Sequence, residues 1–145
     1  MRYTILHQLK PRHRAQLLGL YRGEWWSRHR TEADVARMLD GADVVVVGVV
    51  EPASDTLVGF TRVLTDGIFK AMVFDVIVAP DRRGEGIGRM LLEAALAHER
   101  VHDVEHVELY CRPEHVPLYE KWGFARVPAN LCFMRRARAD RAENL

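Results

Sequence analysis

The chain alternates between segments with contiguous β-branched residues and segments whose hydrophobic residues recur every three or four positions. The first kind predicts buried strands, and the second predicts helices with one apolar face. Strands are expected at residues 3–9, 43–50, 57–64, 68–78, 104–111 and 124–135. Helices are expected at residues 11–21, 31–40, 90–97 and 116–122. This order of elements predicts an α/β fold with a mixed, partly antiparallel sheet and flanking helices.

Several residues mark where these elements begin and end. Pro11 suits the first turn of a helix, and Thr31 is typical of a residue that caps one. Gly41 and Gly123 each follow a helical pattern and are expected to end it. Pro80 lacks the N–H that a strand would need and should end the strand at residues 68–78.

The composition indicates one globular domain. The chain has 145 residues, of which 48% are hydrophobic and 28% are charged, which favours a single domain over residues 1–145. Lys and Arg total 21 against 20 for Asp and Glu. The chain therefore lacks the excess positive charge that is typical of nucleic-acid-binding proteins.

Signals for targeting, for disulfides and for metal binding are weak. The longest apolar stretch, residues 44–50, is too short to cross a bilayer, and the first residues do not resemble a signal peptide. Two cysteines, Cys111 and Cys132, are too few for a disulfide framework. His98, His102 and His106 recur every four residues, but no Glu or Cys completes a metal-ligand set. We expect a cytoplasmic protein with no metal, no membrane partner and no nucleic-acid partner.

A glycine-rich turn, residues 79–89, joins a predicted strand to a predicted helix. Its three glycines occupy alternate positions, so the backbone can turn tightly and approach a bulky ligand closely. Free N–H groups at the start of a helix form a natural phosphate site. A P-loop is excluded because Gly88 is followed by Arg89 and Met90 rather than by Lys and Ser or Thr. A dinucleotide fingerprint would need a third glycine at position 89.

The spacing of Arg83, Gly86 and Gly88 resembles the coenzyme A loop of the GNAT superfamily of N-acetyltransferases. Taken alone, the same residues could form a glycine turn that only starts a helix. A second motif, with Tyr119 followed by Gly123 and Phe124, resembles the signature that ends the last helix of that superfamily. The two motifs occur in order, and the resemblance covers residues 73–133.

The resemblance implies the acyl-CoA N-acyltransferase fold of that superfamily, with a central, mostly antiparallel sheet. In this fold the strand before the loop diverges from the next strand. Acetyl-coenzyme A would place its pantetheine arm on the exposed strand edge and its pyrophosphate on the loop, as edges and helix starts both offer free N–H groups. The residues implied for the cosubstrate are Val76, Ile77, Val78, Arg83, Gly84, Glu85, Gly86, Ile87, Gly88 and Arg89.

Two residues are candidates for proton transfer. The resemblance implies that Tyr119 gives a proton to the departing thiolate, and the alternative is a ring that only packs on the core. Asp75 is a candidate base, because burial between Phe74 and Val76 should raise its pKa towards neutrality. Strand alternation places Asp75 on the same face as Val73 and Ile77 unless a bulge changes the register. The alternative for Asp75 is a carboxylate that caps a turn or pairs with Arg62.

The acceptor pocket is expected between the first two helices. There Glu24, Trp25 and Trp26 could form an aromatic seat for an ammonium group, with Glu24 as its counter-charge. The alternative is that a tryptophan plugs the open end of the sheet.

The function that these residues predict is transfer of an acetyl group to a primary amine of a small molecule, by direct attack in a ternary complex. One alternative is a coenzyme A-binding sensor or scaffold without turnover, and another is an acetyltransferase for a protein amine. An exposed sheet edge also allows a homodimer.

Overall fold

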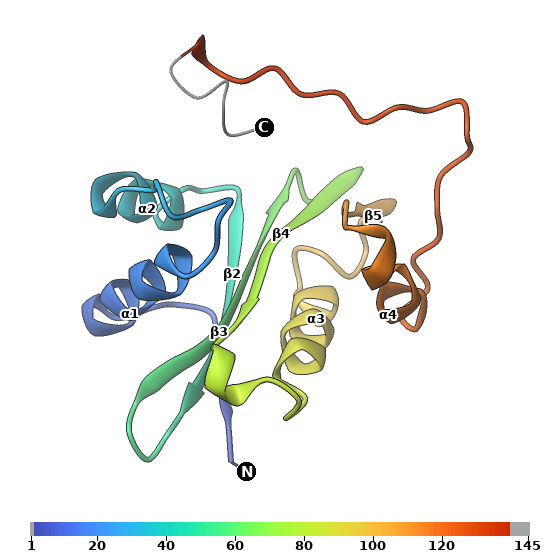
Figure 1. Ribbon diagram of the computed structural model, residues 1–145. Helices are drawn as coiled ribbons and strands as arrows, with labels where there is room; N and C mark the ends of the chain where they lie inside the picture. Colours follow the sequence, from blue (N-terminus) through green and yellow to red (C-terminus); the bar gives the residue numbers. More distant parts are fainter. Residues whose placement is uncertain (1, 140–145) are drawn as a thin grey trace. The chain divides into compact units, whose positions relative to one another are not determined.

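Within residues 2–139 of the computed structural model, five strands pair into one sheet in the order β1-β2-β3-β4-β5 (Figure 1). They are β1 (Thr4–Leu6), β2 (Val44–Glu51), β3 (Thr56–Thr65), β4 (Lys70–Val78) and β5 (His106–Glu108). Successive strands from β1 to β4 are antiparallel, and β5 is parallel to β4. The predicted mixed, mostly antiparallel sheet is confirmed.

The structure describes residues 2–139, which divide into two units, one ending at Leu109 and the other beginning at Tyr110. The first unit contains the sheet and the helices α1 (Pro11–Arg22), α2 (Glu32–Leu39) and α3 (Ile87–Ala97). The second unit contains α4 (Val116–Glu120), preceded by a 3₁₀ turn, Pro113–His115. None of the helices within residues 2–139 is long and apolar enough to cross a membrane.

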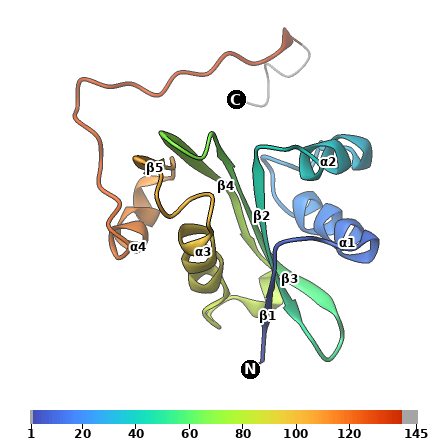
Figure 2. The ribbon, with the colours of Figure 1, turned by 180° about the vertical axis from the view of Figure 1, so that it is seen from behind.

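Helices cover both faces of the sheet in the first unit. Figure 2 shows α1 and α2 on one face and α3 on the other. Each face has its own hydrophobic core, because alternate residues of β2 point in opposite directions. Val47 and Val49 belong to the core under α3, whereas Val46 and Val50 belong to the core under α1 and α2. A bulge between Val49 and Val50 adjusts this alternation.

Several predicted element ends are confirmed. Pro11 begins α1, and the hydroxyl of Thr31 accepts a hydrogen bond from the N–H of Asp34 at 3.2 Å, so Thr31 caps α2 as expected. Gly123 follows α4 with a φ of +86°, a conformation that glycine adopts without strain. The N–H of Gly123 donates to the carbonyl of Glu120 at 3.1 Å.

Three strands are shorter than predicted. β1 has three residues and β5 has three. β4 begins at Lys70 rather than at residue 68, because Asp66 Oδ1 accepts the N–H groups of Ile68, Phe69 and Lys70 and holds the preceding residues in a turn.

The strand predicted at residues 124–135 is wrong, because these residues form no strand in the described part of the chain. Pro128 lies in the middle of the run and cannot donate to a strand ladder. Its carbonyl instead accepts the N–H of Leu131 at 3.1 Å in a turn.

Gly59 of β3 sets the position of the first turn of α3. A Cβ atom on Gly59 would lie 2.5 Å from Cγ2 of Ile87 and 3.3 Å from Cδ1 of Leu91. Both helix residues are buried and have no room to move away. The missing side chain therefore allows α3, and the loop that precedes it, to lie directly on the sheet.

We predict that Gly59→Ala lowers the free energy of unfolding by about 1–3 kcal/mol, the usual cost of overpacking a core. Gly19→Ala is the matched control, because Gly19 is in α1 and a Cβ there meets nothing within 4 Å. That control should gain about 0.5–1 kcal/mol from helix propensity. Urea unfolding of the two variants measures both values, and equal effects would contradict the close approach at Gly59.

Candidate functional site

The glycine-rich turn forms an open cradle of backbone N–H groups. A 3₁₀ turn, Pro80–Arg82, follows β4, and then Gly84 and Gly86 adopt φ values of +83° and +85°. A side chain at these φ values would be strained, which explains why both positions are glycine. The first backbone bond of α3 runs from the N–H of Met90 to the carbonyl of Gly86 at 3.1 Å.

The N–H groups of residues 84–89 therefore precede or begin the helix without helical acceptors. Within residues 2–139 they donate no backbone hydrogen bond. A Cβ on Gly84 or Gly86 would meet nothing within 4 Å, so the space beside these groups is open. The cradle has room for an anion, and the positive end of the α3 dipole faces it.

Two arginines of the turn are exposed and paired with carboxylates. Arg83 contacts Glu24 at 3.3 Å and donates to the carbonyl of Val78 at 3.4 Å. Arg89 pairs with Glu93 one helical turn later at 2.8 Å. Surface pairs of this kind are weak, so both guanidinium groups can turn towards a stronger anionic ligand.

Glu85 is an acidic residue in the middle of the cradle, and contacts with the N-terminal residues hold its carboxylate. Its Oε1 accepts the hydroxyl of Tyr3 at 2.7 Å and pairs with Arg2 at 3.0 Å. Arg82 donates to the Tyr3 hydroxyl at 3.3 Å and forms an ion pair with Glu51. These contacts leave the negative charge of Glu85 compensated beside a site that suits phosphate.

One edge of β4 is unpaired next to this turn. β4 pairs with β5 only over Lys70 to Met72, opposite His106 to Glu108. Within the described residues, β4 has no strand partner on this edge from residue 73 onwards. Its backbone there, including that of Val76 and Val78, can therefore pair with an extended ligand. The expected divergence of β4 from the next strand, β5, is observed.

Asp75 lies at a bulge in this unpaired stretch. Phe74 is opposite Arg62 and Ile77 is opposite Phe60, so β4 has one more residue than β3 at this point. Asp75 takes up the extra residue with a φ of +57°. Val73 consequently belongs to the core under α3, whereas Ile77 belongs to the core under α1 and α2. Asp75 contacts Tyr21 of α1 and so shares the face of Ile77 but not that of Val73, because the bulge changes the register as the sequence analysis allowed.

Three donors converge on Oδ2 of Asp75. The Tyr21 hydroxyl lies at 3.0 Å, Nη1 of Arg30 at 2.7 Å and Nε of Arg62 at 2.6 Å. Only 6% of the Asp75 side chain is exposed. Pairing with Arg62, the alternative interpretation of this residue, is confirmed.

The charges around Asp75 reverse the expected effect of burial. Burial raises the pKa of the Asp75 carboxyl, but the charge of Arg62 and the hydrogen bond and charge of Arg30 outweigh it, so this pKa lies below its ordinary value. The expected rise towards neutrality is wrong. The physical reason for choosing Asp75 as a base is lost with it, since a carboxylate with a lowered pKa accepts protons poorly.

The predicted acceptor residues follow α1 and have different environments. The Trp26 ring packs edge-on against Tyr21, with centroids 6.4 Å apart, and lies 5.5 Å from the Arg30 guanidinium. Trp25 is 55% exposed. Glu24 contacts Arg83, so the structure brings the segment after α1 to the glycine-rich turn. An ammonium seat at Glu24 would have to compete with this arginine.

Tyr119 belongs to the second unit and lies in α4. Its ring packs edge-on against Phe124 with centroids 6.1 Å apart. Burial, and secondarily Cys111, raise the pKa of the Tyr119 phenol above its ordinary value. The phenol is protonated at neutral pH, and the upward shift makes it a weaker acid than a free tyrosine.

Three residues that form hydrogen bonds within the site are not indicated by the sequence. Tyr3, Tyr21 and Arg30 carry no motif signal. Tyr21 lies in the core under α1 and α2, and its hydroxyl also reaches Asp75. Arg30 lies between two helices, where sequence spacing does not indicate what a side chain contacts.

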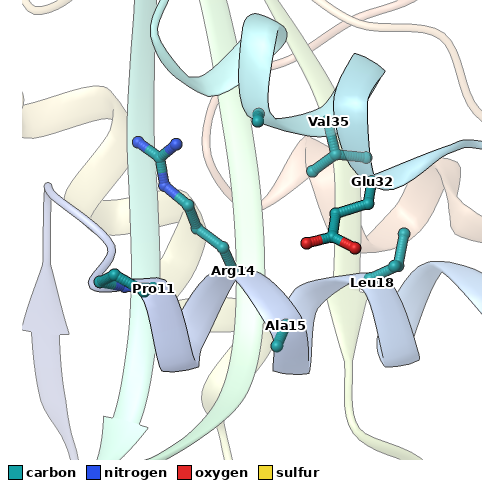
Figure 3. A pocket seen from close by; sticks show the side chains of 7 residues that line it. Pro11, Arg14, Ala15, Leu18, Glu32 and Val35 are labelled. Atoms are coloured by element: carbon teal, nitrogen blue, oxygen red, sulfur yellow. The ribbon is translucent and has the colours of Figure 1, made fainter.

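A shallow cavity between α1 and α2 is too small to be the site (Figure 3). Its volume is about 130 Å³, below the roughly 300–1,000 Å³ of small-molecule sites. It is lined by Pro11, Arg14, Ala15, Leu18, Glu32, Val35 and Ala36. Within residues 2–139, no group of three or more His, Cys, Asp or Glu side chains is arranged to hold a metal ion.

Comparison with known proteins identifies relatives. A family model described as an acetyltransferase (GNAT) domain matches residues 41–126. Serotonin N-acetyltransferase 2, chloroplastic, of Oryza sativa subsp. japonica is 36% identical over 102 residues, which cover 68% of this chain and 50% of that protein. The chain thus spans about half the length, or less, of the first curated relatives that it matches.

Two solved structures are similar over nearly the whole chain. A protein of Xanthomonas campestris pv. campestris described as belonging to the GNAT family has a TM-score of 0.79 and 23% identity, covering 95% of this chain and 94% of that one. At this identity the likeness shows the fold alone. A candidate acetyltransferase of Deinococcus radiodurans R1 has a TM-score of 0.74 and 32% identity, with coverages of 93% and 89%.

We predict that Asp75→Asn lowers the free energy of unfolding at pH 7 by about 3 kcal/mol, because it leaves two half-buried arginines without a counter-charge. Asparagine tolerates the positive φ, so the change isolates the charge. Since the pKa of Asp75 is lowered in the folded state, its contribution is complete above the unfolded pKa of about 4 and is lost as the pH falls below it. The deficit of the variant should therefore shrink in acid.

Urea unfolding between pH 7 and pH 3 measures this deficit. Asp81→Asn is the control, since the Asp81 side chain is exposed and its contact with Arg82 is long, at 3.9 Å. This control should change the free energy of unfolding by less than about 0.5 kcal/mol. A deficit for Asp75→Asn that does not depend on pH would contradict the ionic role.

Proposed function

The chain belongs to the GNAT family of acetyltransferases, and on this premise we propose that it transfers the acetyl group of acetyl-coenzyme A to a primary amine of a small molecule. The amine attacks the thioester directly in a ternary complex. One observation carries the proposal: an unpaired strand edge continues into a cradle of N–H groups at a helix start. This continuity matches a long ligand that has an amide-containing arm and a phosphate group.

The residues present fit acetyl-coenzyme A. The N–H groups of Gly84 to Arg89 would hold the pyrophosphate, and Arg83 and Arg89 would add charge at the rim. The backbone of Val76 to Val78 would pair with the pantetheine arm. The side chain of Ile77 is buried in the core under α1 and α2, so only its backbone can contribute. When bound, the cosubstrate supplies an activated thioester.

Each remaining chemical task has a candidate group in the chain. An N–H on the unpaired edge of β4 would stabilise negative charge on the carbonyl oxygen. Tyr119 would give its proton to the leaving sulfur, the role that the resemblance implies. Because Asp75 has a lowered pKa, we assign the removal of the amine proton to solvent water rather than to Asp75. Turnover should then rise with pH as the amine loses its proton.

A thiol-release assay with acetyl-coenzyme A and a panel of primary amines tests the function. Release that depends on the amine supports acetyl transfer to a small molecule. Cofactor binding without release from any amine would favour a sensor or scaffold, and release only with a protein or peptide would favour a protein acceptor. The proposal treats residues 1–145 as one N-acetyltransferase domain, and a homodimer stays a prediction.

We predict that Gly86→Glu weakens the binding of coenzyme A about tenfold or more, because it adds a side chain and a negative charge where phosphate would lie. Gly67→Glu is the matched control, since Gly67 has a φ of +80° and equally open space but lies in the turn between β3 and β4. Both substitutions cause similar backbone strain. Calorimetric titration should show a loss only for Gly86→Glu, and an unchanged affinity in a folded variant would refute the loop assignment.

We predict that Tyr119→Phe retains coenzyme A binding and lowers the turnover number about a hundredfold, the low end of general-acid contributions. Tyr110→Phe removes a phenol from a half-exposed tyrosine of the same unit and should leave the turnover number within about twofold. Turnover must be measured where the chemical step limits the rate. A normal turnover number for Tyr119→Phe would leave this residue with a packing role only.

A further inference from the structure

The cluster around Asp75 carries one unbalanced positive charge. Arg30 and Arg62 both pair with the single carboxylate of Asp75. Tyr21 adds a hydroxyl but no charge, since burial and the neighbouring carboxylate raise the pKa of its phenol. A half-buried excess charge is costly unless a counter-charge compensates it.

The two arginines also have unused donors. Arg30 gives Asp75 its Nη1 and Arg62 gives its Nε, whereas a guanidinium group has five N–H bonds. Within residues 2–139, no buried side-chain nitrogen or oxygen lacks a hydrogen-bond partner. Arg30 also shares a hydrogen bond with Tyr21. The guanidinium nitrogens of Arg30 and Arg62 that have no partner are therefore not buried, in agreement with side-chain exposures of 26% and 17%.

Neighbouring groups fix the orientation of both guanidinium planes. Arg30 lies over the ring of Tyr21 at 4.7 Å, and Arg62 lies over the ring of Phe74 at 4.7 Å. The segment that carries Arg30 is held by Arg22, which donates to the carbonyls of Arg28 and Arg30 at 2.6 and 2.7 Å. The open N–H edges are thus preorganised, and little side-chain entropy is lost when they bind a ligand.

The position of the cluster connects it to the proposed reaction. Asp75 lies in the stretch of β4 whose edge is unpaired, where the thioester is proposed to bind. The contacts of Asp75 with Tyr21 of α1 and with Arg30 place the cluster on the face covered by α1 and α2. An amine that approaches the β4 edge from this face would bring its other substituents to the two arginines.

We propose that the acceptor amine carries an anionic group, a carboxylate or a phosphate, which binds to the open edges of Arg30 and Arg62. Two fixed guanidinium forks with one excess charge match such a group in charge and in geometry. The proposal rests on the proposed acetyl transfer and specifies its substrate class. It replaces the expected ammonium seat at Glu24, whose carboxylate contacts Arg83.

The test compares amines that differ only in the anionic group. Suitable pairs are tryptophan with tryptamine, phenylalanine with phenethylamine, histidine with histamine, and glucosamine 6-phosphate with glucosamine. The anionic member of at least one pair should have a kcat/KM about tenfold higher or more, mainly through KM. The first three pairs test a carboxylate and the last tests a phosphate. An equal or higher kcat/KM for the neutral member in every pair overturns the proposal.

Variants test whether the arginines cause the preference. Arg30→Gln and Arg62→Lys should each reduce the preference about tenfold, through a higher KM for the anionic member and a smaller change for the neutral one. Arg62→Lys keeps a positive charge beside Asp75, so the ion pair and the fold should be retained. Arg28→Gln is the control, because Arg28 is an exposed residue of the same segment, and only its carbonyl contacts Arg22. A preference that survives both variants overturns the proposal.

A binding measurement separates this proposal from the acetyl transfer on which it rests. Calorimetry with the same amine pairs, in the presence of coenzyme A, does not require turnover. If no amine is acetylated but the anionic members bind more tightly and Arg30→Gln removes the difference, the transferase proposal fails and the anion site stands. Binding that is equal for both members of every pair, or absent, overturns the anion site whatever the turnover.

Discussion

The extra residue at Asp75 is the constraint on which the rest of the site depends. It shifts the alternation of β4: before it Val73 packs under α3, whereas after it Ile77 packs under α1 and α2 and its neighbours Val76 and Val78 pack against the core under α3. A non-glycine residue with positive φ is costly, and here three hydrogen bonds to Asp75 Oδ2 hold it in place. The ion pairs thus fix the backbone at the point where β4 loses its partner on one edge.

The position of the cradle depends on packing at the C-terminal end of β4, where Val78 is opposite Gly59. β4 leads through the 3₁₀ turn directly into α3, and Gly59 lets the first turn of α3 lie on the sheet. The cradle is therefore carried by rigid elements rather than by a long loop, which suits a site that must hold a ligand precisely enough to react. Tyr3 and Arg82 connect the same turn to the first strands.

Sequence patterns were sufficient for features that depend on neighbours in the chain. The Thr31 cap, the stop at Gly123 and the glycine-rich turn follow from local backbone requirements. The sequence does not locate the bulge at Asp75, because the bulge depends on how β4 pairs with β3. No residue of β4 indicates that pairing. The sign of the Asp75 pKa shift was missed for the same reason, since it requires Arg30 from a distant segment. Residues 124–135 were mispredicted because hydrophobic content outweighed the breaker Pro128.

The distribution of charge gives the two proposed ligands separate places. The cosubstrate phosphates and an anionic acceptor would repel each other, so each needs its own positive site. The cradle supplies backbone N–H groups and exposed arginines at the start of α3, whereas Arg30 and Arg62 supply guanidinium edges on the face under α1 and α2. The carboxylates of Glu24 and Glu85 are each paired with a cation. Neither carboxylate therefore repels an incoming anion with an unpaired charge. The unpaired edge of β4 lies between the two positive sites, and there the amine of one ligand would meet the thioester of the other.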